Sequence, residues 1–247
     1  MNTLEQNQAL IAQLLAKEKY NFDDLCQIVS VLRGEGGCPW DIEQNHHSIR
    51  TGMIEECYEV VEAIDKDDAV LLREELGDVL LQLVFHADIE KDAGVFDIQD
   101  VAHDECIKMI HRHPHVFGSV QADTSEQVLQ NWEVIKSEEK QRISLTDKLR
   151  SIPPMLPALM RASKIIKKTE YAAEADKTDL VAQIKDQLDA LACTDQPSMT
   201  QVGQMLMDVT ALCRACGMDA EEALHHANEQ MIQKQAEKEA GQSERIG

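Results

Sequence analysis

The sequence predicts an all-α protein that carries two related helical modules in tandem. Leu, Ala, Met, Gln and Glu are abundant, aromatic residues make up only 4% of the chain, and there are 11 Gly and 6 Pro. This composition favours helix over strand. Apolar residues recur every three to four positions, and no convincing hairpin pattern is found. The second half of the chain also repeats the helical pattern of the first half.

Turn-forming segments divide the periodic regions into the expected helices. The main breaks are GEGGCPW, KDD, HPHVFG, SIPPMLP, TDQP and CGMD. The predicted helices are residues 3–17, 22–33, 49–65, 68–92, 98–113, 125–141, 155–171, 178–192, 198–216 and 219–240. Because the break at KDD is short, the helices on either side of it should be antiparallel neighbours.

The segment SLTDKLRSIPPMLP is the expected domain boundary. It predicts an N-terminal module at 1–145, a linker at 146–157 and a C-terminal module at 158–247. The internal repeat is clearest where REELGDVLLQLVFHADIEKDAG, with Gly77, aligns with MTQVGQMLMDVTALCRACG, with Gly203. Two four-helix modules related by duplication would explain this similarity.

The two copies differ in their acidic residues. Glu75 and Asp78 of the first copy correspond to Gln201 and Gln204 of the second. The first copy also has Glu55, Glu56 and Glu59 where the second has Ala182, Gln183 and Asp186. An amide cannot supply the charge that a magnesium site requires. The second module is therefore predicted to be catalytically inactive, with a structural or dimerisation role.

The net charge of −21 argues against binding to a nucleic-acid polymer or to an anionic membrane. No run of about 18 apolar residues suggests a membrane span. The N-terminal segment is polar and lacks the apolar block of a signal peptide. We therefore expect a cytoplasmic protein. If its substrate is an anion, a divalent cation is the obvious means of inverting the local field.

Acidic residues are concentrated on the predicted helices 49–65 and 68–92. Glu55 and Glu59 are four positions apart and share a helix face, with Glu56 beside them. Glu75 and Asp78 are three apart and likewise share a face. We expect the apolar stripes to pack against each other and the acidic stripes to meet at the edge of that contact. The apolar stripes are Ile54, Tyr58, Val61, Leu76, Val79, Leu80 and Leu83.

Four or five carboxylates brought together in this way would repel one another unless a cation compensated their charge. Oxygen ligands without His or Cys favour Mg²⁺, with Mn²⁺ as a possible substitute, over zinc. Since Mg²⁺ commonly shares substrate phosphates, the pattern indicates phosphoryl chemistry. The alternative is an acidic solvent-exposed face. A di-iron site is disfavoured because it needs two Glu-x-x-His motifs and only Glu222-x-x-His225 is present. A zinc site at Cys213-x-x-Cys216 is disfavoured because there is no second pair of cysteines.

The sequence resembles the MazG family of nucleoside triphosphate pyrophosphohydrolases. The motifs that carry the resemblance are GCPWDIEQ (37–44), EECYE (55–59), ELGD (75–78), RHPHVFG (112–118), WEVIKSEE (132–139) and LPALMRASKI (156–165). The resemblance covers essentially the whole chain. It implies an all-α fold of four-helix modules, usually assembled as a homodimer, and hydrolysis of a nucleoside triphosphate to a nucleoside monophosphate and pyrophosphate.

The resemblance also implies roles for individual residues. Mg²⁺ would be held by Glu55, Glu56, Glu59, Glu75 and Asp78. Glu56 is expected to orient or deprotonate the attacking water, and Glu59 is expected to be a catalytic residue beside it. Arg112 and Lys136 are expected to contact the triphosphate, with His111 where the family often has a second Arg. Trp40 would stack on a base or, more simply, pack in the core, and Asp41 with Gln44 fits a capping box.

Two functional hypotheses follow. The first is a Mg²⁺-dependent pyrophosphohydrolase that removes surplus or non-canonical nucleotides. The second is a non-catalytic helical scaffold that senses nucleotides or binds a partner. The Glu55 to Asp78 set favours the first. Base and sugar preference, the number of metal ions and the geometry of the oligomer are left open.

Overall fold

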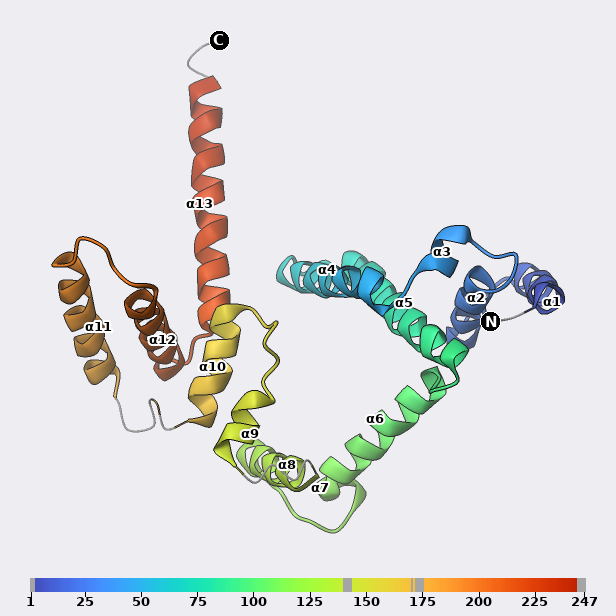
Figure 1. Ribbon diagram of the computed structural model, residues 1–247, viewed down its shortest axis with the longest axis horizontal. Helices are drawn as coiled ribbons and strands as arrows, with labels where there is room; N and C mark the ends of the chain where they lie inside the picture. The colour runs from blue at the N-terminus through green and yellow to red at the C-terminus, as the bar shows by residue number, and fades with distance from the viewer. Residues whose placement is uncertain (1–2, 140–143, 170, 172–175, 244–247) are drawn as a thin grey trace. The chain divides into compact units, whose positions relative to one another are not determined.

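The computed structural model describes residues 3–139, 144–169, 171 and 176–243, and it confirms the all-α class. Helices account for most of the described residues, and no strand occurs among them (Figure 1). The chain divides into two compact units, residues 1–133 and 134–247. This division falls within a helix, α8, and lies upstream of the expected linker at 146–157. The described helices include none that is long and apolar enough to cross a membrane.

In its described residues, the first unit contains seven complete helices and the first part of an eighth. They are α1 (Leu4–Leu15), α2 (Phe22–Arg33), α3 (Pro39–Glu43), α4 (His46–Asp65), α5 (Ala69–Ala93), α6 (Ile98–Arg112), α7 (Pro114–Phe117) and α8 (Ser125–Glu139). The short helices α3 and α7 were not predicted, because so few residues show no periodicity. Each begins with a proline, which is pre-organised for a first helical turn. The predicted end of α8 at 141 lies outside the described residues.

Capping residues explain where α4 and α5 begin and end. Helix α4 starts at His46 rather than at residue 49, because Asn45 Oδ1 accepts hydrogen bonds from the backbone N–H groups of His47 and Ser48 at 3.0 and 3.2 Å. Asp68 caps α5 in the same way, and Gly94 ends α5 with a φ of 71°. The tight turn between the two helices places them side by side (Figure 1), and theirs is the most extensive helix contact of the unit.

The core of the first unit lies between α2, α4 and α5. Val29, Ile49, Val84 and Phe85 form its buried apolar cluster. These positions come from three helices, so their burial fixes α4 and α5 against α2.

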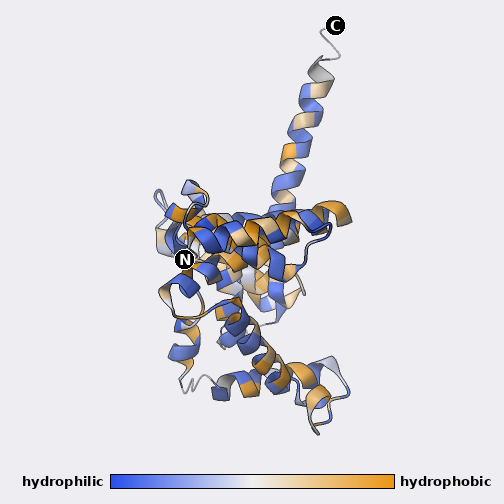
Figure 2. Ribbon diagram, turned by 90° about the vertical axis from the view of Figure 1, so that its right-hand side faces the viewer, coloured by the Kyte–Doolittle hydropathy of each residue, from blue (hydrophilic) through white to orange (hydrophobic). Residues whose placement is uncertain are grey.

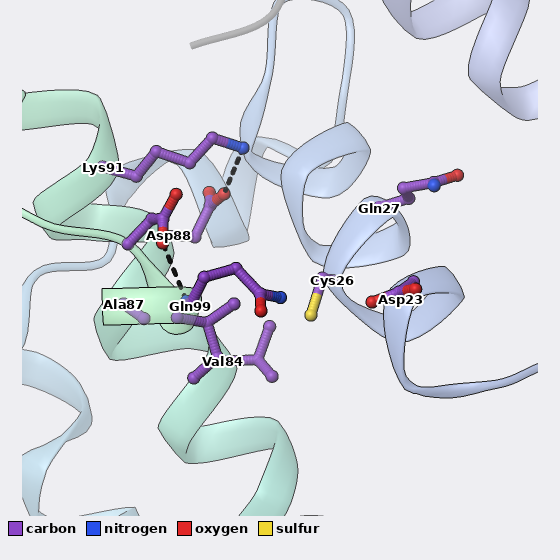
Figure 3. Close-up of a pocket in the computed structure, with 10 residues that line it drawn as sticks. Asp23, Cys26, Gln27, Val84, Ala87, Asp88, Lys91 and Gln99 are labelled. Atoms are coloured by element: carbon purple, nitrogen blue, oxygen red, sulfur yellow. Dashed lines mark hydrogen bonds and ion pairs between the residues drawn. The ribbon is translucent and has the colours of Figure 1, made fainter. Parts of the chain in front are cut away.

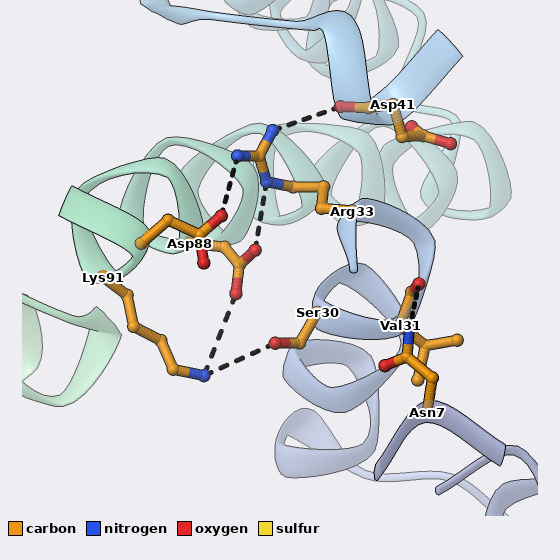
Figure 4. Close-up of polar contacts among 8 residues, drawn as sticks. Asn7, Ser30, Val31, Arg33, Asp41, Asp88 and Lys91 are labelled. Atoms are coloured by element: carbon orange, nitrogen blue, oxygen red, sulfur yellow. Dashed lines mark hydrogen bonds and ion pairs between the residues drawn. The ribbon is translucent and has the colours of Figure 1, made fainter. Parts of the chain in front are cut away.

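A buried ionic network lies beside this core. The Arg33 guanidinium contacts Asp88 at 3.0 Å and Asp92 at 3.2 Å, and it donates to the backbone oxygen of Asp41 at 3.1 Å (Figure 4). It also lies 5.1 Å from the centroid of the Phe85 ring. Arg33 is 3% exposed and Asp88 is 6% exposed. A charge pair this deeply buried is costly to break, because either partner alone would remain unsatisfied.

The second unit contains the rest of α8 and α9 (Leu145–Arg150), α10 (Ala158–Lys168), α11 (Lys177–Ala192), α12 (Met199–Ala215) and α13 (Ala220–Ser243). Ile166, Leu180 and Ala211 form its buried cluster. Helices α11 and α12 make the most extensive contact of this unit, as α4 and α5 do in the first. Helix α13 is exposed along most of its length and largely hydrophilic (Figure 2). The predicted helix at 155–171 begins later, at Ala158, and residue 170 lies outside the described residues.

Candidate metal centre

Three acidic side chains converge where α4 packs against α5. Glu56 comes from α4, and Glu75 and Asp78 come from α5. Each offers one carboxylate oxygen, and these oxygens all lie within 4.8 Å of one another. Glu75 is buried, at 8% exposure, while Glu56 and Asp78 are half-buried. The packing of α4 on α5 thus brings together two sequence motifs that lie on different helices.

The other two predicted acids lie at the margin of this group. Glu59 is exposed on α4, and its carboxyl group helps to raise the pKa of Glu75. Glu55 is also exposed, and its charge acts on Glu56. Neither residue is part of the three-oxygen group itself.

Electrostatic repulsion within the group is visible in its pKa values. Burial raises the pKa of Glu56 above its usual range, and the charges of Asp78, Glu59 and Glu55 raise it further. Burial also raises the pKa of Glu75, followed by the hydrogen bond and the charge of Glu59 and by the charge of Asp78. In both cases the ionised form is disfavoured, because negative charge is concentrated in a partly desolvated place.

The donor set fits a hard divalent cation. All three converging atoms are carboxylate oxygens, which Mg²⁺, Mn²⁺ and Ca²⁺ prefer. Within the described part of the chain, no Lys, Arg or His side chain forms an ion pair with Glu56, Glu75 or Asp78. A bound cation would supply the positive charge that the protein does not provide.

The packing of α4 on α5 differs from the expectation in one respect. Ile54, Tyr58, Val61 and Leu76 were expected to fill the contact between the helices, but they are 49% to 56% exposed in this chain. Val79 and Leu80 are half-buried, and the carboxylates of Glu56 and Glu75 also lie between the two helices. An added side-chain carbon at Gly52 would lie 3.1 Å from the Gln82 amide nitrogen, so α4 and α5 approach closely at Gly52. The prediction that the apolar stripes pack against each other was therefore wrong for Ile54, Tyr58, Val61 and Leu76.

The predicted triphosphate contacts are placed differently from one another. Arg112 is buried, at 7% exposure, with its guanidinium 5.4 Å from the centroid of the Trp132 ring. His113 meets the same ring edge-on, and its Nδ1 lies 2.6 Å from the backbone oxygen of Met109. His111 is exposed. Arg112 was expected to contact the triphosphate, but its side chain is buried beside the ring of Trp132.

Lys136 and Trp40 lie outside the acidic group. Lys136 is half-buried on α8, in the second unit. Trp40 is 63% exposed, so the expectation that it packs in the core was wrong for the single chain. The capping box predicted from Asp41 and Gln44 is also absent. Helix α3 begins after Cys38 with no side-chain cap, and the Gln44 amide donates to the Trp40 backbone oxygen at 2.8 Å.

The second unit holds a polar cluster at the corresponding place. Asp208 is fully buried on α12, and its carboxylate accepts hydrogen bonds from the Tyr171 hydroxyl at 2.5 Å, the Gln187 amide at 2.6 Å and the Gln183 amide at 3.2 Å. Gln204 contacts the Tyr171 hydroxyl. Sequence reasoning missed Asp208. Its position four residues after Gln204, on the same helix face, was the available signal.

A cavity in the first unit lies away from the acidic group. It has a volume of 320 Å³ and lies between α2, α5 and the start of α6 (Figure 3). Cys26, Val84 and Ala87 line it, together with Asp88 and Lys91, whose charged groups are 3.9 Å apart. Because none of the five predicted metal ligands lines this cavity, it is separate from the candidate metal centre.

Comparison with known proteins gives a consistent result. Residues 44–117 match the MazG nucleotide pyrophosphohydrolase domain, and this range contains all five predicted acids. A Thermotoga maritima protein named nucleoside triphosphate pyrophosphohydrolase/pyrophosphatase MazG is 36% identical over 220 residues, which cover 86% of this chain and 83% of that protein. An Escherichia coli K12 protein named nucleoside triphosphate pyrophosphohydrolase is 40% identical over 218 residues, which cover 84% of this chain and 82% of that protein.

A third relative is similar over a shorter range. The uncharacterized protein YabN of Bacillus subtilis is 49% identical over 148 residues. These residues cover 60% of this chain but only 30% of the longer YabN protein. The similarity to YabN therefore concerns part of each chain, whereas the other two relatives are matched over most of their length.

Proposed function

The chain belongs to the MazG nucleotide pyrophosphohydrolase family, and we propose that it hydrolyses nucleoside triphosphates to nucleoside monophosphates and pyrophosphate in a Mg²⁺-dependent reaction. Mn²⁺ is expected to substitute for Mg²⁺. The observation that carries this proposal is the convergence of the Glu56, Glu75 and Asp78 carboxylates on one place between α4 and α5. Without a positive charge there, the same group would repel a triphosphate.

Each acid has a proposed role. Glu56, Glu75 and Asp78 hold the cation, and the exposed Glu55 adds negative charge beside them. The cation neutralises triphosphate oxygens when it is bound. Glu56 and Glu59 are the candidates for orienting or deprotonating the attacking water, since both lie on the α4 side of the group. Water supplies the oxygen that ends on the monophosphate, and pyrophosphate is the leaving group.

The basic and aromatic residues are proposed to bind the substrate. Lys136 and His111 would contact phosphate oxygens, and Trp40 has enough exposed ring to stack on a base. Arg112 could contribute only where its guanidinium is not covered by Trp132. Arg112 therefore has a second proposed role, which is to hold the start of α8 against the end of α6.

A homodimer is proposed because apolar residues beside the acidic group are uncovered. Ile54, Tyr58 and Leu76 are each next to a predicted ligand in sequence, and they are 52% to 56% exposed. A second copy of the same face would remove these side chains from water. We also propose a cytoplasmic location and a role in removing surplus or non-canonical nucleotides.

Product analysis tests the proposed reaction. Purified protein would be incubated with Mg²⁺ and a panel of ribonucleoside and deoxyribonucleoside triphosphates, with Asp78→Asn and Gln204→Ala as variants. Monophosphate and pyrophosphate from the wild type and from Gln204→Ala, but not from Asp78→Asn, are expected. Diphosphate and orthophosphate would overturn the proposed bond cleavage. Metal binding by folded wild-type protein without turnover would favour the scaffold hypothesis.

A further inference from the structure

A carboxylate and two imidazoles form a continuous chain at the other end of the α4–α5 contact. His46, the first residue of α4, lies between His86 and Glu90 of α5. Its Nδ1 is 2.7 Å from His86 Nδ1, and its Nε2 is 2.7 Å from Glu90 Oε1. Both distances are short for hydrogen bonds to nitrogen. The chain therefore fastens the first turn of α4 to the last part of α5.

The ring geometry shows that the two Nδ1 atoms point at each other. The ring planes are 7° apart and the ring centroids are 5.0 Å apart. When two ring centroids are 5.0 Å apart, their Nδ1 atoms come as close as 2.7 Å only if both atoms lie on the line between the centroids. The rings must therefore lie edge to edge and nearly coplanar, rather than face to face. This is the geometry of a direct N–H···N hydrogen bond.

Such a bond limits how many protons the pair can hold. One Nδ1 must carry a hydrogen and the other must offer a lone pair. If the ionised Glu90 accepts the hydrogen on His46 Nε2, the two rings together can carry at most one positive charge. A second added proton would place hydrogens on both Nδ1 atoms, and the contact would become repulsive. We infer that the Glu90–His46–His86 chain is a pH-sensitive latch. The latch is closed while the two imidazole rings together carry at most one positive charge. It releases the start of α4 from α5 when the pair takes up a second positive charge.

The surroundings support a low affinity for that second charge. Burial lowers the pKa of His86 below its ordinary value of 6.5, and the charge of His46 lowers it further. His47 and Arg50, the neighbouring groups on α4, are exposed. From the elements packed on α5, Arg33 of α2 contacts Asp88, and Asp97 caps α6. In the described structure, Glu90 is the carboxylate that contacts the pair.

The latch affects the candidate metal centre because α4 and α5, the helices that it joins, carry the proposed metal ligands. Glu56 is on α4, and Glu75 and Asp78 are on α5. The turn at Lys66–Asp68 joins the helices at one end, and the His46 contact joins them at the other end. Release of the second end removes a restraint on how closely Glu56 approaches the other two carboxylates. The protonation and packing of the Glu90–His46–His86 chain do not depend on catalysis.

Stability measured against pH tests the latch without substrate. Because the His86 pKa is lower in the folded state, the unfolded chain binds more protons as the pH falls below about 6.5. The folding equilibrium constant should therefore fall up to tenfold per pH unit across this window. Denaturant unfolding of the whole chain in EDTA would be measured between about pH 8 and 5 for the wild type, His86→Asn and His47→Asn. Asn retains a hydrogen-bonding group near the Nδ1 position but cannot take up a proton.

The latch predicts a shallower pH dependence for His86→Asn and a wild-type dependence for the exposed control His47→Asn. The same slope in all three proteins would overturn it. Long-range ¹H–¹⁵N NMR spectra of the histidine rings give a second reading on the wild type alone. The expected spectra show that one ring of the pair becomes charged well before the other. If both rings became charged together near the ordinary pKa of histidine, the latch would be refuted.

Discussion

The α4–α5 pair of the first unit and the α11–α12 pair of the second unit differ in how their buried carboxylates are compensated. In α4–α5, Glu56, Glu75 and Asp78 face one another, and no basic side chain in the described structure pairs with them. In α11–α12 the aligned positions carry amides, and the buried carboxylate of Asp208 is surrounded by donors. The first arrangement calls for a cation, whereas the second is satisfied by the protein's own hydrogen bonds.

The two helix pairs both pack closely, but the second has amides where the first has the proposed metal ligands. Gln183, aligned with Glu56, donates to Asp208, and Gln204, aligned with Asp78, contacts the Tyr171 hydroxyl, which donates to Asp208. The Tyr171 hydroxyl is part of the same network. Burial, together with its hydrogen bond to Asp208 and the charge of Asp208, raises the pKa of Tyr171 to about 12. The hydroxyl therefore stays protonated and continues to donate.

The largest expected effect comes from making the first pair resemble the second. Glu75→Gln preserves the shape of the side chain but removes one of the three converging carboxylates. Loss of an outer partner of a metal ligand typically costs about 10-fold to 100-fold, so loss of a ligand should reduce turnover more than about 100-fold. Steady-state kinetics with Mg²⁺ would measure this. Gln201→Ala, at the aligned position of the second unit, should change turnover little, and an inactive Gln201→Ala enzyme would contradict the comparison.

A large loss of stability is expected when the buried ion pair between Arg33 and Asp88 in the first unit is broken. Arg33→Met leaves Asp88 buried without its guanidinium partner at 3.0 Å. Removing one partner of a buried ion pair costs about 3–5 kcal/mol of unfolding free energy. Lys66→Met is the matched control, because Lys66 and Glu62 are 56% and 58% exposed and such pairs contribute about 1 kcal/mol or less. Urea denaturation would separate the two variants, and equal losses would show that Arg33 is not a structural ion-pair residue.

A smaller loss is expected when the carboxylate of the second unit is neutralised. Asp208→Asn replaces an acceptor with an amide whose nitrogen faces other donors. Hydrogen bonds to a charged group contribute roughly 1.5–3 kcal/mol, so stability should fall by about that amount. Turnover per folded molecule should be retained. Asp186→Asn, at an exposed position of α11, is the control for thermal unfolding. An Asp208→Asn protein as stable as the control would show that the network is not needed for packing.

The smallest expected effect is a pH-dependent stabilisation by Mg²⁺. The pKa values of Glu56 and Glu75 are raised in the folded state, so the metal-free fold binds more protons than the unfolded chain near those values. The stability that the metal-free fold gains by binding these protons is present at low pH and is lost as the pH rises through the raised pKa values. Added Mg²⁺ should therefore raise the Tm more at about pH 8 than at about pH 5. A larger shift at the lower pH would contradict the assignment.

The sequence predicted most of the helices, and it placed the acidic residues on shared helix faces, for reasons that are local. Spacings such as Glu75 to Asp78 place two side chains on one helix face wherever the helix lies. The sequence did not predict which face of α4 would meet α5. Ile54 and Tyr58 suggested an apolar contact, but both side chains are more than half exposed, because helix periodicity alone does not determine which face of a helix is covered.

Long-range contacts between polar residues were also missed. The His46–His86 contact joins residues forty positions apart, and neither has a neighbour in sequence that marks the contact. Asp208 was passed over because it aligns with Gln82 rather than with an acid of the first copy. The domain boundary remains a prediction at 146–157, although the compact units meet within α8. Helix periodicity does not indicate where one set of tertiary contacts ends.

The most direct test of the central claim is a measurement of divalent-ion binding to the whole chain without nucleotide. Mn²⁺ binding, followed by electron paramagnetic resonance, would be compared between the wild type, Glu56→Gln and Gln204→Ala. The comparison of the two helix pairs predicts that Glu56→Gln loses the bound ion and that Gln204→Ala retains it. Unchanged Mn²⁺ binding by folded Glu56→Gln would contradict the claim that the α4–α5 carboxylates form the metal centre.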